Sequence, residues 1–288
     1  MNSYKVRPGW SIIHTQADEL RFAGEARQFT VRMPGGVELL LDALRLAEEP
    51  SHRVERVIRE LERLGVVMRS PGDRDIAGRC ARQLEYFDAF GDDSAAIQAR
   101  LERARLLLLG LGGTGSEFLR HMVGVGVRDY LLVDQDVVEE SNFNRQSLYT
   151  YSDVGLPKVV AAQRYVESRL TRARCDTLHT RVRADDQLRQ LIRSFDPTLL
   201  IVAIDDPVDI SRDVAAAAAG LGVPFLIAGV GVRQGRIYPV SHAPGPETSF
   251  CGTDASLATT NAVVAALAAH RAVEFLSGTN LPFEVLDA

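Results

Sequence analysis

Cysteine is scarce in this sequence. The 288 residues include three cysteines, Cys80, Cys175 and Cys251, which lie far apart and form no CxxC pair. A disulfide framework needs a dense, even set of cysteines, and a structural zinc site needs four ligands at short spacings. We therefore expect neither a disulfide-rich fold nor bound zinc.

Long apolar runs are also missing. No stretch approaches the roughly 20 apolar residues that span a membrane, and the segment from Met1 to Ile13 has no apolar core of the kind found in signal peptides. We expect a cytoplasmic protein that does not bind a membrane.

Neither sign of charge dominates. Lys and Arg total 33 against 38 Asp and Glu, so the formal net charge is -5. A surface that binds nucleic acid over most of the molecule would need a basic excess, and we expect no such surface. The hydrophobic content of 46% allows a substantial core, in one large domain or two.

Residues 1–70 are expected to form a domain of their own. Short β-prone pieces alternate with turn residues, and two helical patterns follow them. Ser51 is the expected N-cap of the second helix. The expected elements are strands around Ser11–Ile13, Leu20–Phe22 and Gln28–Val31, helices over Val37–Leu46 and after Ser51 to Leu64, and a closing strand at Val66–Met68. This order predicts a small winged-helix-like α+β domain.

A second domain is expected over residues 106–288, after a linker and lead-in helices over residues 71–105. Ser70 to Ala77 is rich in Gly, Pro and charge, which is typical of a linker. Beyond it, short apolar runs alternate with segments long enough for crossover helices. The runs are Leu106–Leu109, Tyr130–Val133, Leu199–Ala203 and Phe225–Ala228. This pattern predicts an α/β domain with a Rossmann-like, doubly wound, mostly parallel sheet.

The glycine-rich segment after the first of these strands predicts a nucleotide site. Gly110, Gly112 and Gly115 fit the pattern G-x-G-x-x-G, and a helical stretch from Ser116 to Val123 follows. Glycines let the backbone approach phosphates closely, and a helix N-terminus offers free N–H groups to them. Asp134, at the end of the next strand, is placed to accept hydrogen bonds from ribose hydroxyls. The alternative is a structural turn that binds no ligand.

Polar residues that follow Asp134 favour a triphosphate over NAD. The segment up to Gln146 includes Asn142 and Arg145, and Lys158 follows a few residues later. A nicotinamide site needs no such cluster, whereas ATP brings about four negative charges that cations and amides must stabilise. We therefore expect ATP to bind here.

These motifs resemble the ThiF family, which includes the adenylating enzymes of thiamine and molybdopterin biosynthesis and the adenylation domains of ubiquitin-activating enzymes. The resemblance covers residues 82 to about 240 and a C-terminal helix ending at Glu274–Gly278. The matching elements are Gly110–Gly115, Asp134–Gln146, Gly155 with Lys158, and Ala203–Asp206. The resemblance implies an adenylyltransferase that uses ATP and Mg²⁺.

The resemblance also implies a role for each site residue. Asp134 would hold the ribose; Asn142, Arg145 and Lys158 would grip the phosphates. Asp205 would bind Mg²⁺ beside the α-phosphate. The remaining members of the implied ATP site are Gly110, Gly112, Gly113, Gly115, Asp136 and Gln146.

Simpler interpretations of the charged residues stay open. Arg145 and Lys158 could be solvated surface charges. Asp205 could cap a helix before Pro207, with Asp206 sharing or taking over the metal role.

Arg82 matches the arginine that family members insert into the site of the partner subunit. The resemblance therefore implies a homodimer in which Arg82 acts catalytically across the interface. The alternative is an ordinary surface ion pair. Cys251 falls near the loop where some members place a nucleophilic thiol, although a lone loop cysteine is more often incidental.

Residues 1–70 resemble the peptide-binding modules that are fused to ThiF-type proteins in ribosomal-peptide natural-product biosynthesis, as in the microcin C adenylyltransferase. In such modules a leader peptide adds as a strand to a small sheet and packs against a helix. Here the edge would be Gln28–Val31, near the helix after Ser51. A structural or dimerising module is the alternative. DNA binding is less favoured, because the arginines of that helix are interleaved with Glu55, Glu60 and Glu62.

The function expected from these features is ATP-dependent activation of a carboxylate of a ribosomally made precursor peptide, with release of pyrophosphate. One alternative is adenylation of the C-terminus of a ubiquitin-like sulfur carrier. Another is a non-catalytic leader-binding partner of a cyclodehydratase. The presence of Arg145, Lys158 and Asp205 together argues against a decayed site, because clustered charges are costly without a ligand.

Overall fold

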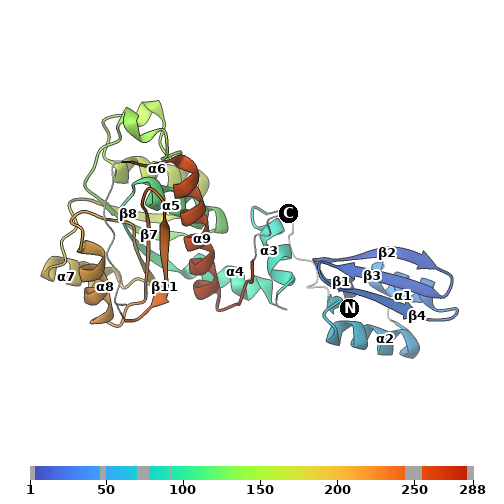
Figure 1. Cartoon of the computed structure of the whole chain (residues 1–288). Coiled ribbons are helices and arrows are strands. Elements are labelled where there is room, and N and C mark those ends of the chain that lie inside the picture. Colours follow the sequence, from blue (N-terminus) through green and yellow to red (C-terminus); the bar gives the residue numbers. More distant parts are fainter. Residues whose placement is uncertain (1–3, 46–49, 70–77, 91–92, 244–254, 284–288) are drawn as a thin grey trace. The chain divides into compact units, whose positions relative to one another are not determined.

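The computed structural model describes residues 4–45, 50–69, 78–90, 93–243 and 255–283 (Figure 1). The chain divides into two compact units, residues 1–96 and residues 97–288, and each is described by itself. The first unit contains the elements expected within residues 1–70 and also helix α3 (Ala81–Asp88). Helix α4 (Ser94–Arg103) begins in the first unit and continues in the second.

The first unit is a small α+β structure. The antiparallel pair β1 (Tyr4–Val6) and β5 (Val67–Arg69) stands beside a three-stranded antiparallel sheet and two helices. These are β2 (Trp10–Gln16), β3 (Glu19–Gly24), β4 (Gln28–Arg32), α1 (Val37–Arg45) and α2 (His52–Arg63). Leu20 and Phe22 alternate along β3 and pack against Leu40 and Ile58 of the helices. This period of two buries one face of the sheet, as a half-covered antiparallel sheet requires.

Local signals set the ends of α2 as the sequence predicts. The hydroxyl of Ser51 accepts a hydrogen bond from the backbone N–H of Val54, which confirms the expected N-cap. Gly65, with a φ of +74°, follows the last residues of the helix and turns the chain into β5.

The second unit is built on a six-stranded sheet in the order β11-β10-β9-β6-β7-β8. Its parallel strands are β6 (Arg105–Leu109), β7 (Asp129–Asp134), β8 (Arg174–His179), β9 (Leu199–Val202) and β10 (Phe225–Val230). Strand β11 (Gly235–Ser241) pairs antiparallel with β10 at one edge. The sheet winds outward in both directions from β6, which confirms the predicted Rossmann-like, doubly wound α/β fold.

Helices cover both faces of this sheet (Figure 1). Alternate side chains of the strands, such as Leu107, Leu109 and Leu131, pack on α7 (Asp186–Phe195) and α8 (Ile210–Ala219). The opposite face carries α5 (Gly113–Val125), α6 (Lys158–Arg169) and α9 (Ala258–Ser277). Because both faces are buried, the inner strands consist of continuous apolar residues.

Two edge strands were not apparent in the sequence. The residues of β8 and β11 mix polar and apolar side chains and are mostly half-buried or exposed, since each strand has a neighbour on one side only. Helix α5 begins at Gly113, earlier than the expected Ser116. Within the residues that the structure describes, no helix combines the length and apolar character needed to cross a membrane.

Candidate active site

A cavity of about 970 Å³ opens at the carboxyl ends of the parallel strands in the second unit. After β6 the chain continues to one face of the sheet, and after β9 it continues to the opposite face. The cavity lies between these two connections. In doubly wound sheets this switch point is the usual ligand site. The cavity wall includes Gly112–Thr114, Gln135–Val137, Glu139, Ser141, Asn142, Asn144–Gln146, Lys158, Ala203–Asp205, Ala228–Val230, Ser256 and Asn261.

Three glycines of the loop after β6 differ in what a side chain at their position would meet. Gly110 has a φ of +94°, and a Cβ there would collide with the backbone oxygen of Ala203. A Cβ on Gly115 would meet the backbone oxygen of Gly110. Gly112 has open space where its Cβ would be, and it lines the cavity. The loop thus needs Gly110 and Gly115 for its own shape, whereas Gly112 leaves room for a ligand.

Asp134 accepts two backbone hydrogen bonds, one of which comes from the glycine loop. Its Oδ2 accepts from the N–H of Leu111 at 2.6 Å, and its Oδ1 accepts from the N–H of Asp136 at 2.7 Å. Burial raises the pKa of the Asp134 carboxyl, while the N–H of Asp136 and the charge of Lys158 oppose the rise. Asp134 lines a smaller cavity of about 160 Å³ that shares Gly112 and Asp205 with the larger one. Its contact with ribose stays a prediction.

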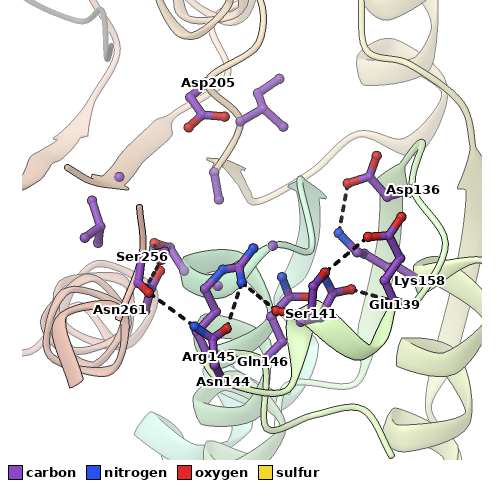
Figure 2. A pocket seen from close by; sticks show the side chains of 18 of the residues that line it. Asp136, Glu139, Ser141, Asn144, Arg145, Gln146, Lys158, Asp205, Ser256 and Asn261 are labelled. Carbon is purple, nitrogen blue, oxygen red and sulfur yellow. Dashed lines mark hydrogen bonds and ion pairs between the residues drawn. The ribbon is translucent and has the colours of Figure 1, made fainter. Parts of the chain in front are cut away.

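Lys158 reaches the cavity from the start of α6. Its Nζ lies 2.8 Å from Oδ2 of Asp136, and Figure 2 marks this ion pair. The backbone fixes this pair, since the N–H of Lys158 donates to the carbonyl of Asp136 and Val137 forms a β-bridge with Pro157. Gly155, with a φ of +87°, makes the return turn. Backbone hydrogen bonds therefore join the motif around Gly155 and Lys158 to the segment that follows β7.

Arg145 presents positive charge without a carboxylate partner. Its Nη1 donates to the carbonyl of Ser141 at 3.0 Å and to Oδ1 of Asn144 at 2.8 Å, both neutral oxygens. Among the residues that the structure describes it forms no ion pair. A guanidinium held in a cavity wall by neutral acceptors is suited to bind an anion.

Two buried amides stand beside Arg145. The Oδ1 of Asn142 accepts from the N–H of Glu139 at 3.0 Å, so this side chain shapes the short 3₁₀ turn Glu140–Asn142. Gln146 is 1% exposed, and its Oε1 has no hydrogen-bond partner within the described chain. A buried oxygen without a partner is costly, and a donor on a bound ligand would satisfy it.

Asp205 lies in the loop after β9, on the other side of the cavity from the segment Ser141–Gln146 (Figure 2). It is exposed and lines both cavities. Helix α8 begins at Ile210 after Asp209, so Asp205 is not the cap of that helix. Asp206 points to Arg181, with 2.7 Å between Oδ2 and Nη2.

Asn261 is a cavity residue that sequence reasoning missed. It lies in the first turn of α9, is 3% exposed, and accepts a hydrogen bond at Oδ1 from the hydroxyl of Thr114 at 3.2 Å. Its Nδ2 donates to Ser256 Oγ and Leu257 O, both at 2.8 Å. A polar amide in an otherwise Ala- and Val-rich helix was the available signal. Further polar wall residues that were not predicted as site residues are Thr114, Gln135, Glu139, Ser141, Asn144 and Ser256.

Arg82, Cys80 and Cys175 are not among the residues that line the cavity. Arg82 is in α3 of the first unit, where its side chain is 94% exposed and lies 3.4 Å from Oε2 of Glu85. Cys80 is half-buried and Cys175 is buried in β8. Burial raises the pKa of the Cys175 thiol to about 12, which makes it a poor nucleophile. Cys251 falls outside the described residues.

The fold and this cavity define a nucleotide-binding α/β protein. Gly112 and Gly113, at the N-terminus of α5, line one cavity together with the cations of Arg145 and Lys158, as a polyphosphate requires. The chain belongs to the ThiF family, whose model matches residues 80–285.

Two curated relatives illustrate the sequence similarity. The sulfur carrier protein adenylyltransferase of Thermus thermophilus is 32% identical over 145 residues, which are 50% of this chain and 52% of that protein. The molybdopterin-synthase adenylyltransferase of Escherichia coli is 30% identical over 201 residues, 64% of this chain and 78% of that protein. The chain thus spans about half the length of the former relative.

Solved structures show a similar fold. E. coli MccB with ATP superposes with a TM-score of 0.73 at 20% identity, covering 96% of this chain and 89% of that one. The microcin C7 biosynthetic enzyme MccB in complex with N-formylated MccA gives 0.73 at 18% identity, with 96% and 89% covered. PaaA gives 0.74 at 20% identity, with 94% and 91% covered.

Proposed function

We propose that this protein is an ATP-dependent adenylyltransferase that activates a carboxylate of a ribosomally made precursor peptide. The observation that carries the proposal is the pairing of a helix N-terminus with two cationic side chains in one cavity. Arg145 brings a charge that no described carboxylate neutralises, and Lys158 brings a buried ammonium. The chain's membership of the ThiF family and its adenylyltransferase relatives support ATP as the anion.

The reaction needs little covalent chemistry from the protein. A carboxylate oxygen of the peptide attacks the α-phosphorus of ATP, and the bond from that phosphorus to the bridging oxygen of pyrophosphate breaks. The products are an acyl adenylate and pyrophosphate, which takes the electron pair of the broken bond. Arg145, Lys158 and the backbone N–H groups at the start of α5 would stabilise charge that moves onto the leaving phosphates.

Mg²⁺ fits the residues present as a partner of the nucleotide. Within the described chain no group of three or more His, Cys, Asp or Glu side chains is placed to hold a metal. Mg²⁺ is usually held by one or two carboxylates together with substrate phosphates and water. Asp205 would supply the carboxylate. The ion would neutralise phosphate charge.

A peptide substrate is supported by the first unit and by the likeness to MccB. The first unit has an exposed sheet edge beside a helix, which is the arrangement that binds an added strand. MccB, whose fold is similar, was solved with MccA. A leader segment would bind at the edge Gln28–Val31 and bring the reacting carboxylate to the site.

A ubiquitin-like sulfur carrier is the second candidate substrate. One curated relative, from Thermus thermophilus, is named a sulfur carrier protein adenylyltransferase, and the ThiF family match covers residues 80–285 of this chain. The two candidates share the same chemistry at ATP and differ only in the carboxylate that they present.

Arg82 would complete the site from a second copy of the chain. Its exposed guanidinium on α3 pairs only loosely with Glu85, at 3.4 Å, so it can turn to another anion. A homodimer with composite sites follows from this assignment.

ATP–pyrophosphate exchange tests the proposed function. Purified full-length protein with Mg²⁺, ATP and labelled pyrophosphate should show exchange that depends on added peptide. Suitable peptides are those encoded by short reading frames beside the gene, and a sulfur carrier ending in Gly-Gly is the competing substrate. Exchange with the carrier alone would favour the second candidate. No exchange with any carboxylate would contradict adenylation.

A further inference from the structure

A groove of about 400 Å³ runs between β4 and α2 of the first unit. Strand β4 forms one wall with Phe29–Met33, which includes the residue that follows the strand. The other wall is a stripe of α2 consisting of Arg53, Arg56, Val57, Glu60 and Leu61, continued by Leu64. Among the described strands β4 pairs only with β3, so its other edge can pair with an added strand.

The floor of the groove is apolar. Phe29 and Val31 are half-buried and stand opposite the fully buried Phe22 and Leu20 of β3 in register. Leu61, from α2, is buried beneath them. An apolar side chain such as Leu laid on this floor would lose most of its contact with water, and this burial favours binding.

Two arginines of α2 are already neutralised on the helix itself. Arg59 pairs with Glu55 at 2.5 Å. Arg63 forms a fork with Glu60, with Nε 2.9 Å from Oε2 and Nη2 2.6 Å from Oε1. Glu60, which among the described residues is the one acidic side chain in the groove wall, is therefore neutralised by Arg63.

Arg53 and Arg56 have no such partner. Neither forms an ion pair or side-chain hydrogen bond with any residue that the structure describes, and both are exposed in the groove wall. Arg32, at the end of β4, forms an ion pair with Glu19, with 2.6 Å between Nε and Oε1. The groove consequently has a net positive rim beside an apolar floor.

The helix and an added strand would set the spacing of the recognised residues. Arg56 and Leu61 are five residues apart, about 7.5 Å along α2, and Arg53 and Leu61 are eight apart, about 12 Å. Two residues of an extended strand span about 6.7 Å and four span about 13 Å, and residues at even spacing face the same side.

We infer that the groove selects an acidic stretch of the peptide in which one apolar residue is separated from a carboxylate by an even number of positions, two or four, in an extended strand. The inference rests on the proposed function for the existence of a peptide substrate. Arg53 and Arg56 are then the residues that determine specificity, each through a charge-assisted hydrogen bond to Asp or Glu of the peptide.

Fluorescence polarisation with designed peptides tests this inference on the full-length protein. The probes are fluorescein-labelled octapeptides of Ser and Thr that contain one Leu and, two positions away, Glu, Gln or Lys. A fourth probe has Leu and Glu adjacent. The Glu probe at spacing two should bind at least about tenfold more tightly than the other three, a difference of about 1.4 kcal/mol. Equal binding of all four, or no binding by any, would overturn the inference.

Variants of α2 locate the effect. Arg53→Gln and Arg56→Gln should each weaken binding of the Glu probe, whereas Arg59→Gln, on the same helix but paired with Glu55, should not. The double variant R53E/R56E should prefer the Lys probe. Circular dichroism would confirm that each variant is folded.

Two results would contradict the assignment. An equal loss of binding in Arg59→Gln would show a general effect of charge. Displacement of the Glu probe by duplex DNA at lower concentration than by peptide would identify a nucleic-acid surface. Either result would overturn the inference.

Failure of the proposed function gives a different pattern. If no peptide supports pyrophosphate exchange while the Glu probe binds and depends on Arg53 and Arg56, adenylation fails and the groove assignment stands. If exchange with a precursor proceeds with the same KM in wild type and in the R53Q/R56Q variant, the groove assignment fails and adenylation stands.

Discussion

The ammonium of Lys158 and the carboxylate of Asp136 form an ion pair of unequal burial. Their side chains are 6% and 53% exposed, and 2.8 Å separates Nζ from Oδ2. Loss of either partner therefore has different consequences. Removal of the lysine leaves a carboxylate that water can solvate, whereas removal of the carboxylate charge leaves a buried ammonium beside a neutral group.

Lys158→Met should affect ATP more than stability. Methionine fills the space of the lysine stem, and the exposed carboxylate of Asp136 stays solvated. The free energy of unfolding should therefore change by less than about 1 kcal/mol. ATP affinity should fall roughly 10- to 100-fold, as expected for the loss of a hydrogen bond between charged groups. Asp136→Asn should instead lower the free energy of unfolding more than it lowers ATP affinity. Thermal unfolding and calorimetric titration with ATP would measure both, and equal effects of the two variants on ATP would contradict the assignment of Lys158 to the phosphates.

Asp205→Ala should abolish turnover without unfolding the protein. Asp205 is an exposed cavity residue, so its removal should change the thermal midpoint little, while pyrophosphate exchange should fall by about 100-fold or more. Asp206→Ala is the matched control, because Asp206 is directed to Arg181. It should keep exchange within a few-fold of wild type. If the two variants exchange alike, Asp205 does not hold the metal.

The fold was predictable because its signals are local. The apolar runs that became β6, β7, β9 and β10 are inner strands buried on both faces, and the glycine pattern lies where strand order reverses. The site was predictable in part, since the loop from Asp134 to Lys158 is nearly continuous in sequence. Asn261 enters the same cavity from a helix more than 100 residues later. The amide in an apolar helix marks a polar site, but the sequence does not show which residues it meets, because that contact depends on how α9 packs against α5.

Arg82 and Lys158 should complement each other between chains if Arg82 acts across a dimer. Arg82→Ala and Lys158→Ala should each lose exchange activity when alone. A mixture allowed to exchange subunits should regain roughly a quarter of the wild-type sites, because half of the dimers are mixed and each mixed dimer has one intact site of two. Native mass spectrometry would verify the mixed dimers. Mixed dimers without recovered activity would rule out the trans role of Arg82.

Cys175 should resist alkylation in the native protein. Its thiol has a pKa of about 12, raised by burial in β8, so the reactive thiolate forms only as pH rises toward that value. At pH 8.5 modification by iodoacetamide should be on the order of 10²- to 10³-fold slower than in urea, where the pKa is about 8.5. The neutral thiol is the form that the fold favours, so its contribution to stability is lost as pH rises through about 12. Peptide mapping by mass spectrometry would follow the rate. Equal rates in native and unfolded protein would contradict the burial.

Two glycines of the loop should separate folding from nucleotide binding. A Cβ at Gly112 would project into open space in the cavity wall, so Gly112→Ala should fold normally. Its methyl group would stand where phosphate approaches the backbone, and ATP affinity should fall by at least about 10-fold, or about 1.4 kcal/mol.

A Cβ at Gly115 would instead collide with the backbone oxygen of Gly110, which cannot move without breaking the turn. Gly115→Ala should therefore lower the free energy of unfolding by about 1–3 kcal/mol. Chemical denaturation and ATP titration of both variants would measure the separation. If Gly112→Ala kept full ATP affinity, the phosphates would have to lie away from the N-terminus of α5.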